Sequence, residues 1–350
     1  MDFGGAEKLL VNTSNILVKR HTIHIIYLKG EAKLQPLLDP QITLHKVNLG
    51  PSCITPLRTL LKSIKPDVIH THLGHADLIG LFASRNLAAK LFCTMHNVWF
   101  KWNRIDYLIF YLYRILFRTV ARHCKVTCVS RAIMHHVIHT LGVKKENVVL
   151  LPNAIPDRIE EESKLQAREE LKIGKNDYVV LFIGRLRIQK SVDTLISSAI
   201  HLKSYIPFLK ILIVGEGHLR EELELLSAKL DLEQIVEFRG VTLTPNKYLQ
   251  ASDVFVLPSV FEGLPTVILE AFRASIPVIA SDIDGTNDLI EHTVNGLLFQ
   301  AKDTQKLAEH IKCLYNDSSY AATIGKSGNK SFKNKYTIEK YVEQLEDNYL

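Results

Sequence analysis

The chain has 350 residues, a length typical of about two domains, and 47% of them are hydrophobic against 23% charged. This composition is that of a globular protein with buried cores, and it contains no internal repeat and no low-complexity tract. The net charge of +6 is uneven, because residues 1–155 carry 20 Lys and Arg against 8 Asp and Glu. We therefore expect an anionic partner for the first half, such as phosphate groups or a membrane surface.

The five cysteines form neither a Cys-x-x-Cys pair nor a disulfide framework, which favours a reducing compartment. No signal peptide opens the sequence, and no 18-residue apolar run is available to cross a bilayer. These features predict a cytoplasmic protein, and they leave room for peripheral contact with the inner face of the cell membrane.

The first half alternates helical and strand patterns along the chain. Residues 8–19 have helical spacing, residues 21–28 alternate as a strand, and residues 57–64 form a short helix. Further strands are predicted at 66–70, 91–95, 126–130 and 148–151. Such alternation predicts parallel βαβ units. No strand precedes residues 1–7, although they resemble the loop after one, so either a strand lies upstream or the chain is a shortened copy.

Polar residues follow several of these strands. His70, His72, His96 and Ser130 stand at predicted carboxyl ends, where parallel sheets bind their ligands. With His75 and Asp77, the two histidines at 70 and 72 could hold a metal ion. Acceptor contacts or ordinary polar residues at a strand end are the alternatives.

Residues 98–122 combine two Trp, several Phe and Tyr, and five basic residues with aliphatic ones. One interpretation is a helix in a membrane interface, with aromatic rings among the headgroups and cations toward anionic lipid. The alternative is an ordinary buried helix with solvated arginines.

The charged stretch that follows Pro156 indicates a domain boundary, and the strand–helix alternation then begins again. We expect a first domain over residues 1–156 and a second over 157–330. The last segment, 331–350, is expected to end in a helix that packs back on the first domain. In the second half, strands are predicted at 178–183, 209–214 and 236–239, and helices at 191–202 and 218–230.

Residues 252–299 hold the most specific pattern. Val254–Leu257 is a short apolar strand ended by Pro258, and Pro277–Ala280 is another. The helix between them has Glu262 in the loop before it and Glu270 within it. Around its start, Gly263 permits close backbone approach and Pro265 suits a first turn, so free N–H groups there could bind an anion or hydroxyl.

Arg185 and Lys190 lie in a loop that starts at Gly184 after a predicted strand. Two cations beside a helix start can clamp a diphosphate. A solvated basic loop is the alternative, as surface helix charge is for Glu262 and Glu270.

Taken together, these motifs resemble a GT-B-fold glycosyltransferase of family 4, the retaining group that uses nucleotide-sugars. The E-x7-E motif, formed by Glu262 and Glu270 between Pro258-Ser259 and Pro277-Val278-Ile279-Ala280, is highly specific. The other matching residues run almost end to end: Gly4-Gly5-Ala6-Glu7, His96, Ser130, Pro152-Asn153, Gly184-Arg185-Leu186 with Lys190, Gly215-Glu216-Gly217 and Phe238-Arg239-Gly240.

The resemblance implies two Rossmann-like domains with parallel sheets and an active site in the cleft between them. It implies that Arg185 and Lys190 bind the donor diphosphate, with Gly4 and Gly5 closing from the first domain. Glu270 would hold the ribose, and Gly240 and Val241 would lie near the base. Around the transferred sugar it places Glu262, the backbone of Gly263, Leu264, Pro265 and Thr266, and His96.

His96 would orient sugar or acceptor hydroxyls, or it is a hydrogen-bonded structural histidine. The resemblance implies no metal ion and no other cofactor, because the two cations stabilise the leaving diphosphate. Ser191 replaces the glycine that usually follows the lysine, and we expect its backbone to remain helical.

The sequence thus predicts a retaining transferase of hexosyl or N-acetylhexosaminyl groups. Its donor would be a nucleotide-sugar, with UDP expected, and its acceptor a lipid-linked or polysaccharide precursor of a cell-surface glycan. No nucleic acid is expected as a partner. The alternatives are a nucleotide-sugar epimerase or phosphorylase on the same fold, and an inactive nucleotide-sugar-binding protein.

Overall fold

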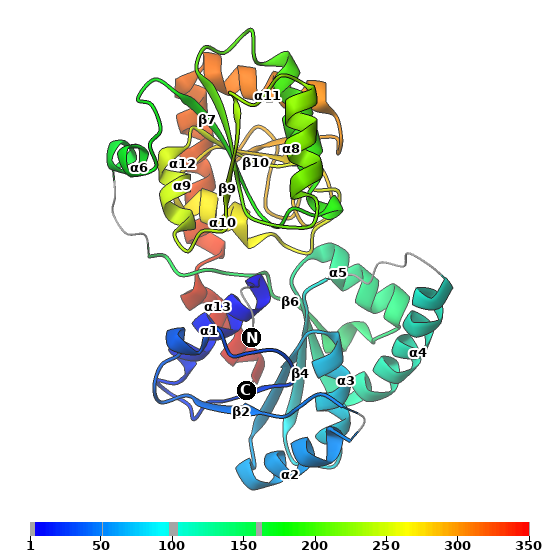
Figure 1. Ribbon diagram of the computed structural model, residues 1–350. Coiled ribbons are helices and arrows are strands. Elements are labelled where there is room, and N and C mark those ends of the chain that lie inside the picture. Colours follow the sequence, from blue (N-terminus) through cyan, green and yellow to red (C-terminus); the bar gives the residue numbers. More distant parts are fainter. Residues whose placement is uncertain (1–3, 51, 98–103, 159–162, 350) are drawn as a thin grey trace. The chain divides into compact units, whose positions relative to one another are not determined.

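The computed structural model describes the backbone of residues 4–50, 52–97, 104–158 and 163–349, and the side chains in these ranges except at His75, 104–109 and Val120. It divides into two units (Figure 1). Unit 1 comprises Met1–Pro156 with Ile338–Leu350, and unit 2 comprises Asp157–Thr337. Residues 331–337 therefore lie in unit 2, and the chain returns to unit 1 from Ile338 onward.

Unit 2 is built on one parallel six-stranded sheet with the order β12-β11-β10-β7-β8-β9. Its central strands are apolar along nearly their whole length, because helices cover both faces and leave no strand face to water. The strands are β7 (Tyr178–Ile183), β8 (Leu209–Val214), β9 (Val236–Gly240), β10 (Val254–Leu257), β11 (Val278–Ser281) and β12 (Leu297–Phe299).

Two groups of helices cover this sheet. In Figure 1, α8 lies on one side of it and α9 and α10 lie on the other. Helix α7 packs on α8 and α11, whereas α10 packs on α9 and α12. The helices are α6 (Lys164–Glu170), α7 (Val192–Ser198), α8 (Arg220–Lys229), α9 (Pro245–Ala251), α10 (Thr266–Arg273), α11 (Thr304–Asn316) and α12 (Ser318–Lys335).

Unit 1 holds two parallel sheets. One pairs β1 with β2, and the other has the order β3-β4-β5-β6. Among the residues that the structure describes, no strand precedes the first helix, and no hydrogen-bonded pairing joins the two sheets. The strands are β1 (His24–Tyr27), β2 (Thr43–Lys46), β3 (Val68–His72), β4 (Lys90–Met95), β5 (Cys124–Cys128) and β6 (Val148–Leu150).

Shared helices cover both of these sheets. Ile26 of β1 and Ile69 of β3 pack against one cluster with Leu57 and Leu61 of α2 (Ile54–Ile64), which also includes Ala83 of α3 (Gly74–Ala83). A second hydrophobic cluster forms where α1 (Gly5–Leu17) packs on α13 (Ile338–Tyr349). The unit also contains α4 (Arg104–Val120) and α5 (Arg131–His135), which continues as a π-helical segment, His136–Leu141.

The parallel α/β architecture confirms the predicted fold class, and most predicted strands agree with the observed ones to within a few residues. β2 and β12 were not predicted. β2 has four residues and only one aliphatic side chain, and β12 has three residues, too few to show a strand pattern. The expectation of a helical Ser191 was wrong. Its backbone is left-handed, with φ 44° and ψ 47°, so α7 begins at Val192 and ends at Ser198.

Candidate active site

The strand order of unit 2 reverses between β7 and β10. Chain connections run outward from β7 to β8 and β9 on one side, and from β10 to β11 and β12 on the other. In parallel sheets of this kind, ligands bind beyond the carboxyl ends of the strands at such a switch point. The loops after β7 and β10 carry the predicted cations and Glu262, so the topology brings both predicted motifs to this edge.

Close glycine contacts hold these loops together. A Cβ on Gly215 would lie 1.9 Å from the carbonyl oxygen of Gly184, and a Cβ on Gly217 would lie 2.1 Å from that of Leu186. Leu186 N–H also donates to Glu216 O at 2.9 Å. The loops after β7 and β8 therefore touch through their backbones, which only glycine permits at these positions.

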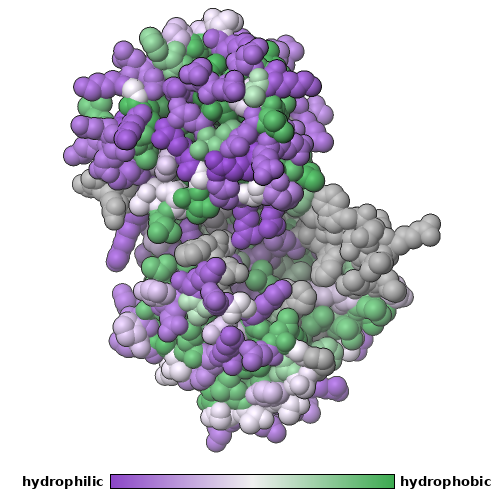
Figure 2. Space-filling view, in the orientation of Figure 1, coloured by the Kyte–Doolittle hydropathy of each residue, from purple (hydrophilic) through white to green (hydrophobic). Residues whose placement is uncertain are grey.

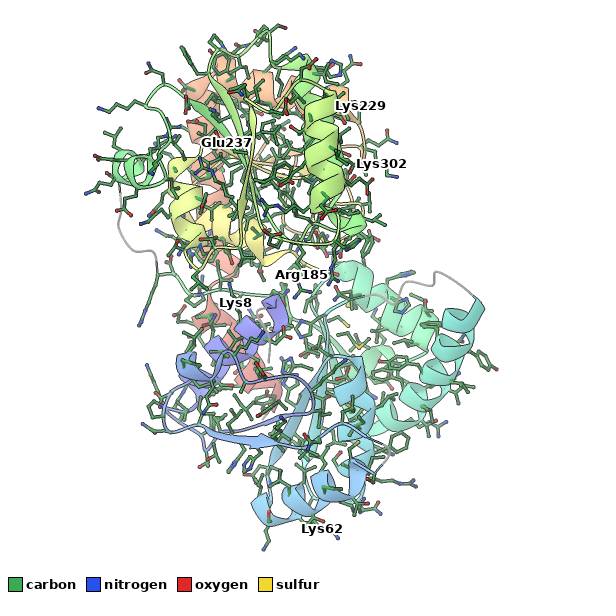
Figure 3. The ribbon with its side chains drawn as sticks, viewed as in Figure 1. Lys8, Lys62, Arg185, Lys229, Glu237 and Lys302 are labelled. Atoms are coloured by element: carbon green, nitrogen blue, oxygen red, sulfur yellow. The ribbon has the colours of Figure 1, made fainter. Side chains whose placement is uncertain are left out.

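The two predicted cations differ in their surroundings. Arg185 is exposed, and its guanidinium has no ion-pair partner among the described residues. Figure 3 places it at the edge of unit 2 formed by these loops, away from Lys229 and Lys302. Lys190 is largely buried and forms an ion pair with Glu262, with 2.5 Å between Nζ and Oε1. An exposed cation and a paired cation thus lie on the same loop.

The Glu262 carboxylate contacts side chains of its own loop and of the loop after β7. Its side chain is 8% exposed, and Oε1 also accepts from Ser259 Oγ at 2.6 Å. Gln189 Nε2 lies 3.5 Å from Oε2 and donates to the carbonyl oxygen of Phe261 at 3.0 Å. The sequence analysis selected Lys190 and Glu262 separately, and the structure joins them directly. Neither Ser259 nor Gln189 was selected as a site residue.

Helix α10 starts beside Glu262. Pro265 is the N-cap residue, and within the described part of the chain no side-chain cap bonds the start of the helix at Thr266. Gly263 and Leu264 are buried, and a Cβ on Gly285 would lie 2.5 Å from the Gly263 carbonyl oxygen. Glu270 follows Thr266 by about one turn. The helix start therefore offers backbone donors beside a carboxylate, an arrangement that can bind hydroxyl or phosphate oxygens.

Gly240 is the last residue of β9, and Val241 follows it at the same edge. Gly240 has a left-handed φ of 67°, and its carbonyl oxygen accepts from Gly215 N–H at 2.7 Å. Val241 is 72% exposed. The structure thus places both residues on the loop next to Gly215, and their role at a base stays a prediction.

Unit 1 contains a row of histidines at the ends of β3 and β4. His96 Nε2 lies 3.2 Å from His72 Nδ1, and the His72 ring stacks on His70 at 4.4 Å between centroids. His70 contacts Thr94 Oγ1 at 2.7 Å and the Tyr349 hydroxyl of α13 at 2.6 Å. The histidine row is therefore anchored to the neighbouring strand and to the last helix.

Burial keeps these imidazoles neutral. It lowers the pKa of His72 to about 4 and, with a contribution from His72, that of His96 to about 3. The pKa of His70 is also well below its usual value, mainly through burial. A neutral imidazole donates one hydrogen bond and accepts one, so His96 suits hydroxyl groups better than anions.

A cavity of about 180 Å³ lies beside His96, lined also by Leu73, Asp77, Met95 and Tyr113. Asp77 is fully buried and accepts from the Thr71 hydroxyl at 2.8 Å, and burial raises its pKa to about 8. Within the described part of the chain, no group of three or more His, Cys, Asp or Glu side chains is arranged around a common metal position.

Gly4 is the N-cap of helix α1 and Gly5 its first residue, and among the described residues no side chain caps that end. They belong to unit 1, whereas the other predicted donor residues belong to unit 2. Closure of this glycine pair on a diphosphate therefore stays a prediction.

Part of the aromatic segment 98–122 lies outside the described residues, namely 98–103. In α4, Phe110, Tyr113 and Phe117 are buried against unit 1. Its other face exposes four large apolar side chains, and Figure 2 shows hydrophobic residues at this edge of the unit. They are Tyr111, Leu112, Ile115 and Leu116. Across the described residues, no helix has the length and hydrophobicity that a membrane span requires.

Two parallel-sheet units, one of which carries a lysine–glutamate ion pair and an exposed arginine at its switch point, are the features of a glycosyltransferase of the GT-B fold. Each half of the sequence matches a glycosyltransferase family description: Glycosyltransferase Family 4 over residues 3–158, and Glycosyl transferases group 1 over residues 163–331. The chain belongs to glycosyltransferase family 4, which confirms the predicted family and enzyme class.

Two relatives support this assignment, and a solved structure supports the fold. The chain is 27% identical over 361 residues to the "GalNAc-alpha-(1->4)-GalNAc-alpha-(1->3)-diNAcBac-PP-undecaprenol alpha-1,4-N-acetyl-D-galactosaminyltransferase" of Campylobacter jejuni, covering 99% of this chain and 96% of the relative. It is 27% identical over 308 residues to the "UDP-Gal:alpha-D-GlcNAc-diphosphoundecaprenol alpha-1,3-galactosyltransferase" of Escherichia coli, covering 84% and 78%. The structure of Anabaena HepE in complex with UDP has the same fold, with a TM-score of 0.86 and 21% identity, covering 99% of this chain and 96% of that one.

Proposed function

We propose that the protein is a retaining glycosyltransferase that moves a sugar from a UDP-sugar to a lipid-linked precursor of a cell-surface glycan. The observation that carries this proposal is the ion pair of Lys190 with Glu262 at the switch point of unit 2, with the exposed Arg185 on the same loop as Lys190. The names of the two bacterial relatives specify diphosphoundecaprenol-type acceptors, and one specifies a UDP-sugar donor. HepE has been solved with UDP and with UDP-glucose.

The charges of unit 2 fit the donor in this proposal. Arg185 and Lys190 bind the diphosphate and stabilise the negative charge that grows on it as the sugar departs. The N–H groups of Thr266 and Val267 at the start of α10 face hydroxyl or phosphate oxygens of the donor. Glu262 accepts from sugar hydroxyls, Glu270 from the ribose, and Gly240 with Val241 lies near the base. The chain's own cations supply the charge in this mechanism, and no metal ion is invoked.

The transfer itself exchanges one bond at the anomeric carbon. The acceptor hydroxyl oxygen bonds to that carbon on the face from which the diphosphate leaves, and the carbon–oxygen bond to the diphosphate breaks. The leaving diphosphate oxygen takes the acceptor proton, so the product keeps the donor's anomeric configuration. His96, held neutral by burial, orients hydroxyl groups by hydrogen bonding rather than by carrying charge.

We further propose that unit 1 contacts an anionic membrane through α4. Its exposed face offers Tyr111, Leu112 and Ile115 for the acyl–headgroup boundary. The basic first half supplies the charge that attracts anionic lipid. A cytoplasmic enzyme docked in this way would meet a lipid-linked acceptor at the membrane surface.

The test is to incubate purified protein with UDP-, GDP- and ADP-sugars and with undecaprenyl-diphosphate-linked sugars, and to analyse the products by mass spectrometry and NMR. We expect acceptor-dependent consumption of a UDP-sugar and an α-configured product from an α-configured donor. Sugar epimerisation without acceptor would contradict the proposal, as would a requirement for inorganic phosphate. Nucleotide-sugar binding without any turnover would indicate an inactive binding protein instead.

Co-sedimentation with vesicles tests the membrane contact separately. Binding to vesicles with phosphatidylglycerol should exceed binding to neutral phosphatidylcholine vesicles, and Leu112→Glu with Ile115→Glu should remove it. Leu225→Glu, at a 70% exposed leucine of unit 2, is the matched control. Equal binding by both variants would contradict the proposed role of α4.

A further inference from the structure

The Glu262 carboxylate has three side-chain partners in two loops. Ser259, in its own loop, is fully buried and donates to Oε1 at 2.6 Å. Lys190, from the loop after β7, approaches the same oxygen at 2.5 Å. Gln189, the residue before it, directs Nε2 toward Oε2 at 3.5 Å. One partner is charged and the other two are neutral.

Gln189 also connects the two loops independently of Glu262. Its backbone carbonyl accepts from Val260 N–H at 2.9 Å, and its side-chain amide donates to the Phe261 carbonyl oxygen at 3.0 Å. The segment that carries Glu262 is thus held to the segment that carries Lys190 by bonds that involve neither charged group. This connection persists if the ammonium moves.

In the proposed reaction, the donor diphosphate competes with Glu262 for the Lys190 ammonium. A diphosphate carries more charge than one carboxylate, and a lysine ammonium on a flexible four-carbon chain can change partner with little backbone movement. If the ammonium leaves, however, Glu262 is a nearly buried carboxylate that has lost its cation. A buried charge without partners is strongly unfavourable, so neutral donors must hold it in place.

We propose that Ser259 and Gln189 are positioning residues that keep the Glu262 carboxylate in place when Lys190 exchanges it for the donor diphosphate. This inference rests on the proposed function and adds the residues that prepare Glu262 for the sugar. Before the donor binds, the Lys190 ammonium is paired with Glu262 Oε1. After the diphosphate has drawn Lys190 away, the freed Oε1 accepts a sugar hydroxyl while Ser259 and Gln189 continue to donate.

The proposal predicts a selective loss of affinity for the sugar part of the donor. Calorimetric titration would compare UDP with the UDP-sugar that the wild type binds most tightly, chosen among UDP-glucose, UDP-galactose and their N-acetylamino forms. In Ser259→Ala, the dissociation constant for the UDP-sugar should rise about tenfold, as expected when a hydrogen bond to a charged group is lost. The dissociation constant for UDP, whose diphosphate also draws Lys190 away, should rise clearly less, because no sugar hydroxyl depends on the position of the carboxylate. Gln189→Met should act in the same direction.

Ser281→Ala is the matched control. Ser281 is also fully buried, ends the neighbouring strand β11, and its hydroxyl has no hydrogen-bond partner among the described residues. This variant should bind UDP and the UDP-sugar as the wild type does. Since Ser259→Ala could disturb folding, thermal unfolding is measured for each variant, and the partly exposed Gln189 provides a second, less disruptive site.

The outcomes separate the inference from the proposed function. If the wild type binds neither UDP nor any UDP-sugar, the proposed function falls, and the inference falls with it. If the wild type binds both but Ser259→Ala and Gln189→Met leave the two affinities unchanged, or reduce both equally, the inference alone is overturned. A selective loss for the UDP-sugar, with a parallel fall in kcat in the transfer assay, supports it.

Discussion

The two units of the molecule use the same parallel architecture in different ways. Unit 2 has one unbroken sheet, and every residue of β10 and β11 is buried. Unit 1 divides its strands between a pair and a group of four, and β3 (Val68–His72) is mostly only partly buried and contains two histidines. Unit 2 therefore has the properties of a rigid platform, whereas unit 1 keeps polar groups inside its strands.

The charge states of the polar residues also differ between the two sites. In unit 2, the carboxylate of Glu262 and the ammonium of Lys190 are both charged and neutralise each other. In unit 1, burial favours the uncharged forms of His72, His96 and Asp77. The comparison teaches that one unit is prepared for an ionic ligand and the other for neutral hydroxyl groups. The predictions below test that contrast, in order of decreasing expected effect.

The largest effect is expected from removing the charged pair of unit 2. Lys190→Ala and Glu262→Ala should each lower kcat/KM by about 10²–10³-fold, the typical loss when a group that stabilises developing charge is removed. Lys229→Ala, at an exposed lysine at the end of α8, is the control and should leave the rate unchanged. A wild-type rate in either site variant would contradict the placement of the donor site at this edge of unit 2.

Hydrogen exchange tests the difference between the sheets. We expect the amides of β1 and β2 to exchange at least about 100-fold faster than those of β7 and β8, because a two-stranded sheet opens locally at lower free energy. Mass spectrometry of peptides covering 24–46 and 178–214 measures both. Equal protection would show that the break between the sheets of unit 1 carries no energetic cost.

The histidine row should make unit 1 sensitive to acid. His70, His72 and His96 have folded pKa values below the unfolded value of about 6.5, so the unfolded state binds protons more readily. Their contribution to stability is therefore complete above about pH 6.5 and declines as pH falls toward the folded pKa values. Between pH 7 and 5, we expect unit 1 to lose up to about 2 kcal/mol per histidine.

Urea unfolding monitored by hydrogen exchange at pH 7 and pH 5 measures this loss in each unit. His72→Gln should reduce the pH dependence of unit 1. His201→Gln, at an exposed histidine of unit 2, should not. If both variants had the same pH dependence of stability, the loss at low pH could not be assigned to the histidine row.

The smallest effect concerns the left-handed Ser191. A side chain in this region costs roughly 1–2 kcal/mol relative to glycine, but Ser191 Oγ also bonds Thr194 Oγ1 at 2.9 Å and Asp193 Oδ1 at 3.1 Å. We expect Ser191→Gly to stabilise unit 2 by about 0.5 kcal/mol. Ser198→Gly, at the buried last residue of α7, should destabilise it. A clear loss of stability in Ser191→Gly would show that the hydrogen bonds outweigh the backbone strain.

The sequence was sufficient to predict what local pattern determines. The strands at 178–183, 209–214 and 254–257 were predicted to within a residue, because each is a buried apolar run that glycine, proline or serine ends. The choice of Lys190 and Glu262 rested on motif spacing. Their direct contact was not predicted, since it joins residues 72 positions apart through a switch point that only the strand order defines.

Other features have no local signature. Ser259 was noted only as part of the frame of the E-x7-E motif, and its 2.6 Å bond to Glu262 could not be read from the sequence. Tyr349 contacts His70 across 279 positions. The left-handed Ser191 was missed because the residue type gives no sign of it, whereas glycine at that position would have done so.

Unit 1 is formed by two separate segments of the chain, and this has a consequence for its folding during translation. Its core combines Leu9 and Leu17 of α1 with Tyr341, Val342 and Leu345 of α13. The unit whose strands leave the ribosome first therefore cannot complete its core until the final helix has been translated, whereas all of unit 2 is available earlier. Although domains generally fold in order from the N-terminus, here the second unit can complete its folding before the first.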